Sequence, residues 1–387
     1  MEMIRRTVDK TSGSCGESAS LRILFEGALW SGSDSYAYVR ALRRAGHSVT
    51  AIEAANFLPT GWRSKWLRGL RRILEPWLIA EYERALIDMA RHLSPQLFIG
   101  FKANYVTPAA MHVIKDTGAV AINVYPDVSF MAQGPRLPKT LPLYDWVFTT
   151  KTFGLKDLES TLGVRNASFF PPAYDPEVHA PCELDAADRA HYQADVSFIG
   201  SWSPKKEMVM AALAQAMPDA RIRIWGNTWD RASSESLRSA IEGRVVTGLE
   251  YAKCVRASRI NLGLLSEQVQ GASSGDLITH RTFAMPACGG FMLHERTAEI
   301  TQYFEEGIDC ALFSDNEDLV AKARYYLDHE SERAFVAEAG RARALRSGYS
   351  VDARIQEVLS RFEIIAARKR RSSGVSESDN PFNRGTG

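Results

Sequence analysis

The sequence predicts an α/β protein made of two Rossmann-like domains whose parallel sheets face a central cleft. With 387 residues the chain is longer than one compact core usually needs, so two domains are expected. Short apolar runs of strand length alternate with helical patterns in both halves, which is typical of parallel α/β sheets. A proline-containing, acidic stretch at 173–193 separates the halves and is typical of a linker.

The N-terminal domain is expected at 21–172. It opens with an apolar run ending on glycine, a helical pattern at 33–47 and a second apolar run, the β–α–β unit of a parallel sheet. The expected strands are LRILFEG (21–27), SVTAIEA (48–54), PQLFIGFK (95–102), VAINVYPD (120–127), YDWVFTTK (144–151) and ASFFPPAYDP (167–176). Sheets of this kind bind ligands at the carboxyl ends of their strands.

The C-terminal domain is expected at 194–349 and repeats the pattern. Its expected strands include ADVSFIGSW (194–202), ARIRIWGN (220–227) and RINLGLL (259–265). Residues 281–307 predict a helix, a tight turn at Gly289–Gly290, a buried strand and then an acidic helix whose N-terminus faces the cleft, where phosphate would bind. A last helix at 350–368 is expected to pack back on the body. The polar ends, 1–20 and 369–387, are expected to be disordered.

Composition narrows the function. The 47 basic and 46 acidic residues balance, which gives no electrostatic reason to expect nucleic acid as a partner. The five cysteines are scattered without metal-site or redox spacing, so we expect reduced thiols and no metal. The N-terminus has no apolar core of signal-peptide length, and a cytoplasmic protein is expected.

Three segments of the C-terminal half resemble a known family. RTFAMPACGGFMLHERTAEITQYFEEGIDCALFSDNEDLVAKARYYL (281–327) is similar to the C-terminal signature of the CgeB-like, spore-maturation-type glycosyltransferases, and DVSFIGSWSPKKE (195–207) and IWGNTW (224–229) match earlier strand ends. The resemblance covers about 21–365. It implies a group-one enzyme of GT-B fold, with a nucleotide-diphosphate sugar in the C-terminal domain, the acceptor in the N-terminal domain, retention of configuration, and no metal or other cofactor.

The resemblance also implies where the donor binds. Its diphosphate needs positive charge or free backbone N–H groups, and glycines let the backbone approach it. The donor-binding candidates are Gly27, Gly200, Ser201, Lys205, Gly226, Asn227, Asp276, Arg281, Gly289, Gly290, Glu295, Thr297 and Glu299. Lys206, which follows Lys205, is a further candidate. A solvated helix start for the lysines, and plain turns or a helix C-cap for the glycines, are the alternative interpretations.

One position departs from the family pattern. The wider group has two glutamates separated by seven residues, and the second commonly contacts the donor ribose. Here Asp276 stands at the first position and Ala284 at the second, so half of the pair is missing. Glu295 or Glu299 is a candidate replacement. The departure favours, as an alternative, a catalytically silent protein that binds a nucleotide sugar or glycan.

Candidate catalytic residues are Asp127, at a strand end, and His280, beside Arg281. The carboxylate is suited to orient an acceptor hydroxyl or take its proton, and the imidazole to donate to phosphate or leaving group. A turn-forming aspartate and a packing histidine are the alternatives. An NAD-dependent oxidoreductase is a remote alternative, since GALWSG and GSWSPK follow the first strands in place of G-x-G-x-x-G.

Residues 61–77, GWRSKWLRGLRRILEPW, combine aromatic and basic residues at helical spacing. Such a helix either lies on an anionic membrane surface or packs on the core with its arginines solvated. Peripheral membrane contact would suit a lipid-linked acceptor. Glycan, lipid and protein acceptors all stay open.

Overall fold

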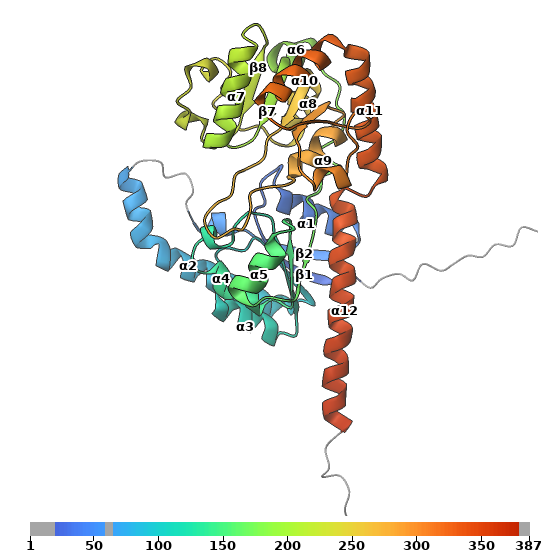
Figure 1. Cartoon of the computed structure of the whole chain (residues 1–387). Helices are drawn as coiled ribbons and strands as arrows, with labels where there is room; N and C mark the ends of the chain where they lie inside the picture. The colour runs from blue at the N-terminus through green and yellow to red at the C-terminus, as the bar shows by residue number, and fades with distance from the viewer. Residues whose placement is uncertain (1–19, 59–64, 379–387) are drawn as a thin grey trace, which may run out of the picture.

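The computed structural model describes residues 20–58 and 65–378, and consists of two α/β halves joined by long connections (Figure 1). The predicted α/β architecture with two parallel sheets is confirmed. The first sheet has the order β2 (Ser48–Ile52), β1 (Arg22–Glu26), β3 (Leu97–Phe101), β4 (Val120–Tyr125), β5 (Trp146–Thr149) and β6 (Ala167–Phe169). The second has the order β11 (Ala311–Phe313), β10 (Met292–Glu295), β9 (Ser258–Gly263), β7 (Ala194–Ile199) and β8 (Ile222–Trp225). Every pairing is parallel. The expected leader, apart from Ser20, lies outside the described residues.

The strands are short and mostly buried, as parallel strands covered on both faces should be. Every residue of β4, VAINVY, is buried.

Helices cover both faces of each sheet, and each face has its own hydrophobic core cluster. The helices are α1 (Asp34–Arg44), α2 (Lys65–Leu93), α3 (Pro108–Asp116), α4 (Leu137–Thr140), α5 (Gly154–Leu162), α6 (Ala186–Tyr192), α7 (Pro204–Ala216), α8 (Gly248–Ala257), α9 (His280–Ala287), α10 (Asn316–Asp328), α11 (Glu330–Arg346) and α12 (Val351–Ser378). Within the described part of the chain, none of them is long and apolar enough to cross a membrane.

The last helix, α12, runs from the C-terminal half along the N-terminal half (Figure 1). Val351, Ile355, Val358 and Phe362 are buried in the same cluster as β1, β4 and α1, so this helix completes the core of the first sheet. The helix is longer than the sequence predicts. It reaches Ser378, and the Lys369 ammonium binds the Asp145 carboxylate at 2.8 Å. The expectation that disorder starts at 369 is therefore corrected.

Two other expectations are corrected. The linker at 173–193 contains α6, whose N-cap Asp185 accepts a hydrogen bond from the Asp188 amide at 2.7 Å. The acidic helix expected after β10 is only a 3₁₀ turn, Ile300–Gln302. Glu299, just before this turn, is buried, whereas the expected helix would have exposed its N-terminus to the cleft.

Candidate functional site: two connected cavities in the cleft

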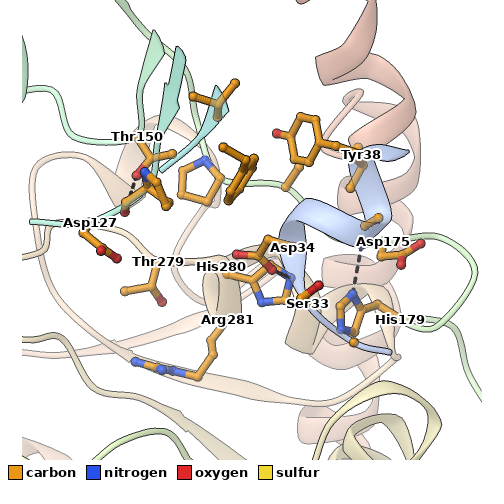
Figure 2. A pocket seen from close by; sticks show the side chains of 18 of the residues that line it. Ser33, Asp34, Tyr38, Asp127, Thr150, Asp175, His179, Thr279, His280 and Arg281 are labelled. Atoms are coloured by element: carbon orange, nitrogen blue, oxygen red, sulfur yellow. Dashed lines mark hydrogen bonds and ion pairs between the residues drawn. The ribbon is translucent and has the colours of Figure 1, made fainter. Parts of the chain in front are cut away.

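The carboxyl ends of both sheets meet at the cleft, because all strands of each sheet run the same way. A cavity of about 320 Å³ lies between the halves. The start of α1 and the loops after β4 and β5 line it from the N-terminal half, and the start of α9 lines it from the C-terminal half. Figure 2 shows Asp34, Asp127 and Thr150 opposite Thr279, His280 and Arg281.

A second cavity of about 180 Å³ continues into the C-terminal half. The loops after β7 and β8 and the start of α8 line it. The two cavities share Gly32, Asp34, His179, His280 and Arg281, so one elongated ligand can occupy both.

Glycines form the floor of the smaller cavity. Gly226 has φ +150°, and a Cβ there would lie 2.0 Å from the Gly200 carbonyl oxygen, so no other residue fits without moving the loop. A Cβ on Gly200 would lie 2.7 Å from Nη1 of Arg281. Ser201 and Asn227 line the same cavity. The two glycines therefore bring backbone and guanidinium close together.

Arg281 is the cation that both cavities share. Its Nη2 donates to the Leu264 carbonyl at 2.7 Å and its guanidinium lies over the Phe198 ring, but its Nε has no hydrogen-bond partner among the described residues. The third N–H group of α9 is already capped by Thr279, so the guanidinium is the group at this helix start that is suited to bind a phosphate or diphosphate.

The buried side chain of His294 contacts the first turn of α9 and holds it in place. Thr282 Oγ1 accepts from the Thr279 amide at 3.0 Å and lies 2.9 Å from Nε2 of His294. The other ring nitrogen, Nδ1, lies 2.7 Å from the Glu295 carbonyl oxygen. Burial lowers the pKa of His294 to about 4, so the neutral ring accepts from the threonine and donates to the carbonyl.

The lysines after β7 are placed behind the cavity walls rather than in them. Lys205 forms an ion pair with Glu295 at 2.5 Å, and the other oxygen of Glu295 accepts from the Leu265 amide at 3.0 Å. Lys206 is buried and donates to the Ser201 carbonyl and to Ser266 Oγ, with burial lowering its pKa to about 8. Both lysines thus hold the loops that form the two cavities.

Asp276 joins the two halves. Its carboxylate binds the Lys151 ammonium at 2.6 Å, and the two side chains are only 8% and 7% exposed. Burial acts to raise the pKa of Asp276, but Lys151 overrides it and the pKa lies below its usual range. Thr152 donates to Glu299 at 2.8 Å across the same interface. The cleft is therefore closed by specific polar contacts beside the larger cavity.

The two candidate catalytic residues lie in the larger cavity (Figure 2). The Asp127 carboxylate pairs with Lys102 at 2.5 Å. His280 Nε2 lies 3.5 Å from Asp34 Oδ1, and its ring packs against that of His179. Asp34 belongs to the N-terminal half, so this contact also bridges the cleft.

Several predicted donor residues lie elsewhere. Gly289 and Gly290 precede β10, so they lie at the amino edge of the sheet, where Arg256 donates to the Gly289 carbonyl at 3.1 Å. Their assignment to the donor site is corrected: they form a helix C-cap, with Gly289 at φ +76°. Thr297 Oγ1 accepts from Ile300 at 3.1 Å and so caps the 3₁₀ turn. Gly27 lies at the end of β1, next to a separate small cavity.

Other site residues were absent from the predicted set. Asp34, Thr150, Lys151 and His179 line the larger cavity but were not singled out. Thr150 and Lys151 directly follow β5, so the rule that ligands lie at strand carboxyl ends could have indicated them. Nothing in the local sequence marks His179, which comes from the connection between the halves.

Comparison with known proteins agrees with this geometry. The family model described as "Glycosyl transferase-like" matches residues 205–360. No curated protein sequence matches the chain. Among solved structures, a glycosyltransferase from Rickettsia africae is 11% identical with a TM-score of 0.61, covering 90% of this chain and 99% of that one. Sucrose-phosphate synthase from Thermosynechococcus elongatus is 13% identical with a TM-score of 0.62, covering 90% and 100%.

A third similar structure, Anabaena HepE in complex with UDP-glucose, is 12% identical with a TM-score of 0.55 and covers 89% of this chain and 99% of HepE. At these identities the likeness shows the fold alone. The chain has the GT-B fold of these proteins. That fold, with the family match of the C-terminal half, supports a glycosyltransferase.

Proposed function

We propose that the protein transfers a sugar from a nucleoside diphosphate sugar to an acceptor bound in the N-terminal half. The observation that carries the proposal is Arg281, which lies at the start of α9, lines both connected cavities, and has an Nε without a hydrogen-bond partner among the described residues. The smaller cavity, with its close backbone approach at Gly226, suits the nucleoside. The larger cavity, between the halves, suits the sugar and the incoming acceptor.

The proposed chemistry is stabilisation of the leaving diphosphate. Arg281 and the first N–H groups of α9 lie where negative charge would grow as the glycosidic bond breaks. Asp127 is proposed to orient the acceptor hydroxyl, and His280 to donate to the phosphate. We propose retention of configuration and no metal or cofactor besides the donor. The helix N-terminus and Arg281 would then supply the charge that a metal supplies elsewhere.

We also propose the CgeB-like subtype, which the residue pattern at 281–327 supports, and with it a role in the synthesis of cell-envelope or surface glycans. Membrane contact through 61–77 is also proposed. Residues 61–64 lie outside the described part of the chain, but Ile73 and Trp77 on α2 are exposed, at 76% and 60%. Exposed apolar side chains of this size on one helix suit insertion at a lipid surface.

A second candidate function is binding of a nucleotide sugar or glycan without transfer. Ala284 favours it, because this side chain is fully buried in the core under α9 and brings no carboxylate toward the ribose. Glu295 is held by Lys205 and Glu299 by Thr152, and neither lines the two cavities. Turnover, not binding, separates the two candidates.

The test combines binding and turnover. We would measure thermal shift with UDP, GDP, dTDP, ADP and NAD, each with and without EDTA, on the wild type, Arg281→Lys and the control Arg238→Lys, which is 81% exposed on the surface. We expect one nucleoside diphosphate to stabilise the protein with or without EDTA, and only Arg281→Lys to weaken this at least tenfold.

Release of free sugar from the matching nucleotide sugar, followed by NMR, then reports turnover and the anomeric configuration. Binding without turnover would favour the silent binder. Stabilisation by NAD alone would overturn both candidates.

A further inference from the structure

A groove of about 790 Å³ lies at the amino edge of the second sheet, where Ser258 begins β9. The starts of α8 and α9 line the smaller donor cavity, and the other ends of both helices reach the groove, at Arg256 and at the turn of Gly289. An α-helix rises about 1.5 Å per residue, so the eight residues of α9 separate the two places by about 12 Å. The groove is therefore distinct from the donor site.

The groove gathers positive charge from four elements: α6, α8, β9 and α11. Its lining has a formal excess of three positive charges, although the net charge of the whole chain is only +1. The charged side chains that line it are Arg189, Arg256, Arg259, Arg333 and Arg341, with Glu330 and Glu338. Such an excess in one concave surface favours an anionic ligand.

Three of these arginines have no carboxylate partner. Arg259 pairs with Asp195 at 3.2 Å, and Arg333 lies 3.9 Å from Glu330. By contrast, the side chains of Arg189, Arg256 and Arg341 form no ion pair with any described residue.

Backbone carbonyl groups take up few of the remaining donors. The ends of α8 and α9 present carbonyl groups that favour cations, yet of the three unpaired arginines only Arg256 uses one, donating to Gly289 at 3.1 Å. Arg189 and Arg256 are exposed. Arg341 is half-buried, and only its Nε is sealed off without a partner, so both of its Nη groups can reach a ligand. Each guanidinium has five N–H donors, so most of them stay available.

Two of the unpaired arginines meet over one glycine. A Cβ built on Gly289 would lie 3.2 Å from Nη1 of Arg256 and 3.6 Å from Cδ of Arg341. The two side chains come from α8 and α11, and their like charges repel each other. An anion bound between them would remove this repulsion, and the planar guanidinium fork matches the oxygen atoms of a phosphate.

We propose that this groove binds a small molecule that carries two or more phosphate groups, with Arg256 and Arg341 holding one of them. The groove has room for more than a single phosphate, and its other arginines would meet the second group. This site is separate from the proposed transferase reaction, and Arg281 takes no part in it.

The test is isothermal titration calorimetry on the full chain at fixed ionic strength, with inorganic phosphate and tripolyphosphate as probes. We expect saturable binding of tripolyphosphate, at least tenfold tighter than that of phosphate. Arg256→Gln and Arg341→Gln should each weaken it at least tenfold, because each removes a charged pair of donors. The control Arg238→Gln, 81% exposed and outside the groove, should leave it unchanged. Arg341 has no hydrogen bond to lose within the described protein, so the urea midpoint of Arg341→Gln should match the wild type.

A second series separates the groove from the donor cleft. Because the proposed donor site also binds phosphate groups, the same titrations are repeated in the Arg281→Lys background, where tripolyphosphate binding should persist and still depend on Arg256 and Arg341. Binding that is lost with Arg281→Lys and unaffected by the groove variants would place the probe in the donor cleft and overturn the proposal. Equal affinity for phosphate and tripolyphosphate, an equal loss in Arg238→Gln, or no saturable binding would also overturn it.

Discussion

The ion pair between Lys151 and Asp276 should decide how firmly the two halves hold together. The charged atoms lie 2.6 Å apart and the side chains are 7% and 8% exposed, so water screens them little. At an effective dielectric constant of about 20 their attraction is about 6 kcal/mol, most of it offset by the loss of hydration. Removing one partner leaves the other charge buried, which costs about 3–5 kcal/mol.

We therefore expect Lys151→Met and Asp276→Leu each to lower the free energy of unfolding by about 3–5 kcal/mol. The double variant Lys151→Met/Asp276→Leu should lie within about 1–2 kcal/mol of the wild type, because an apolar pair of similar volume needs no hydration. Urea unfolding at pH 7, monitored by tryptophan fluorescence and circular dichroism, measures all four proteins. Small-angle scattering should show that only the single variants open the cleft.

The double-mutant cycle provides the refutation. If the losses of the two single variants simply add in the double variant, the two side chains do not interact, and the cleft is closed by other contacts. A loss below about 1 kcal/mol in either single variant would equally show that the pair is hydrated in solution.

Three further outcomes are expected. Burial raises the pKa of Glu26 from 4.5 to about 8, so the native state keeps a proton that the unfolded chain releases, and stability is lost as pH rises between these values. The free energy of unfolding of Glu26→Gln should therefore exceed that of the wild type by about 3 kcal/mol at pH 7, measured as a pH series of urea midpoints. Burial lowers the pKa of His294 from 6.5 to about 4, so stability present above pH 6.5 is lost as pH falls toward 4, by about 3 kcal/mol, and His294→Gln should flatten that limb of the same series. Gly226→Ala, whose Cβ would lie 2.0 Å from the Gly200 oxygen, should abolish the nucleoside diphosphate thermal shift.

Each of these has an outcome that would contradict it. A pH-independent difference between Glu26→Gln and the wild type would mean that Glu26 is ionised in the native state. An unchanged acid limb in His294→Gln would assign that limb to other groups. A full nucleotide response in Gly226→Ala would show that the loop after β8 lies outside the donor site.

Much of the fold follows from the sequence because parallel sheets have a simple pattern. Buried strands such as β4 appear as short apolar runs, and the residues just after them lie at the ligand edge. This is why Asp127, Gly200, Ser201 and Gly226 were found from the sequence and do line the cleft. Gly289 and Gly290 are the opposite case. They precede a strand, so chain direction already places them at the far edge of the sheet.

Other features have no local signature. Whether an acidic segment forms a helix depends on what it packs against. Glu299 lies in the interface because Thr152, from the other half of the chain, donates a hydrogen bond to it. The partners Lys151 and Asp276 are 125 residues apart by number, and periodicity carries no information about such pairs. Glu26 sits in an apolar run as a strand-end residue, and only the packed structure shows that its carboxyl group is buried.

The position of α12 has a consequence for synthesis of the chain on the ribosome. Val351, Ile355 and Val358 fill one face of the first sheet, although that sheet is translated first. Only α1 covers this face when the N-terminal half emerges, so the part that α12 will cover stays exposed while the C-terminal half is made. Chaperones that bind exposed apolar surface should bind a nascent chain stalled before residue 351 more strongly than a chain stalled later, once residues up to 366 have left the exit tunnel. The final stabilising step for the half made first is thus delayed until the C-terminal half and α12 have been translated.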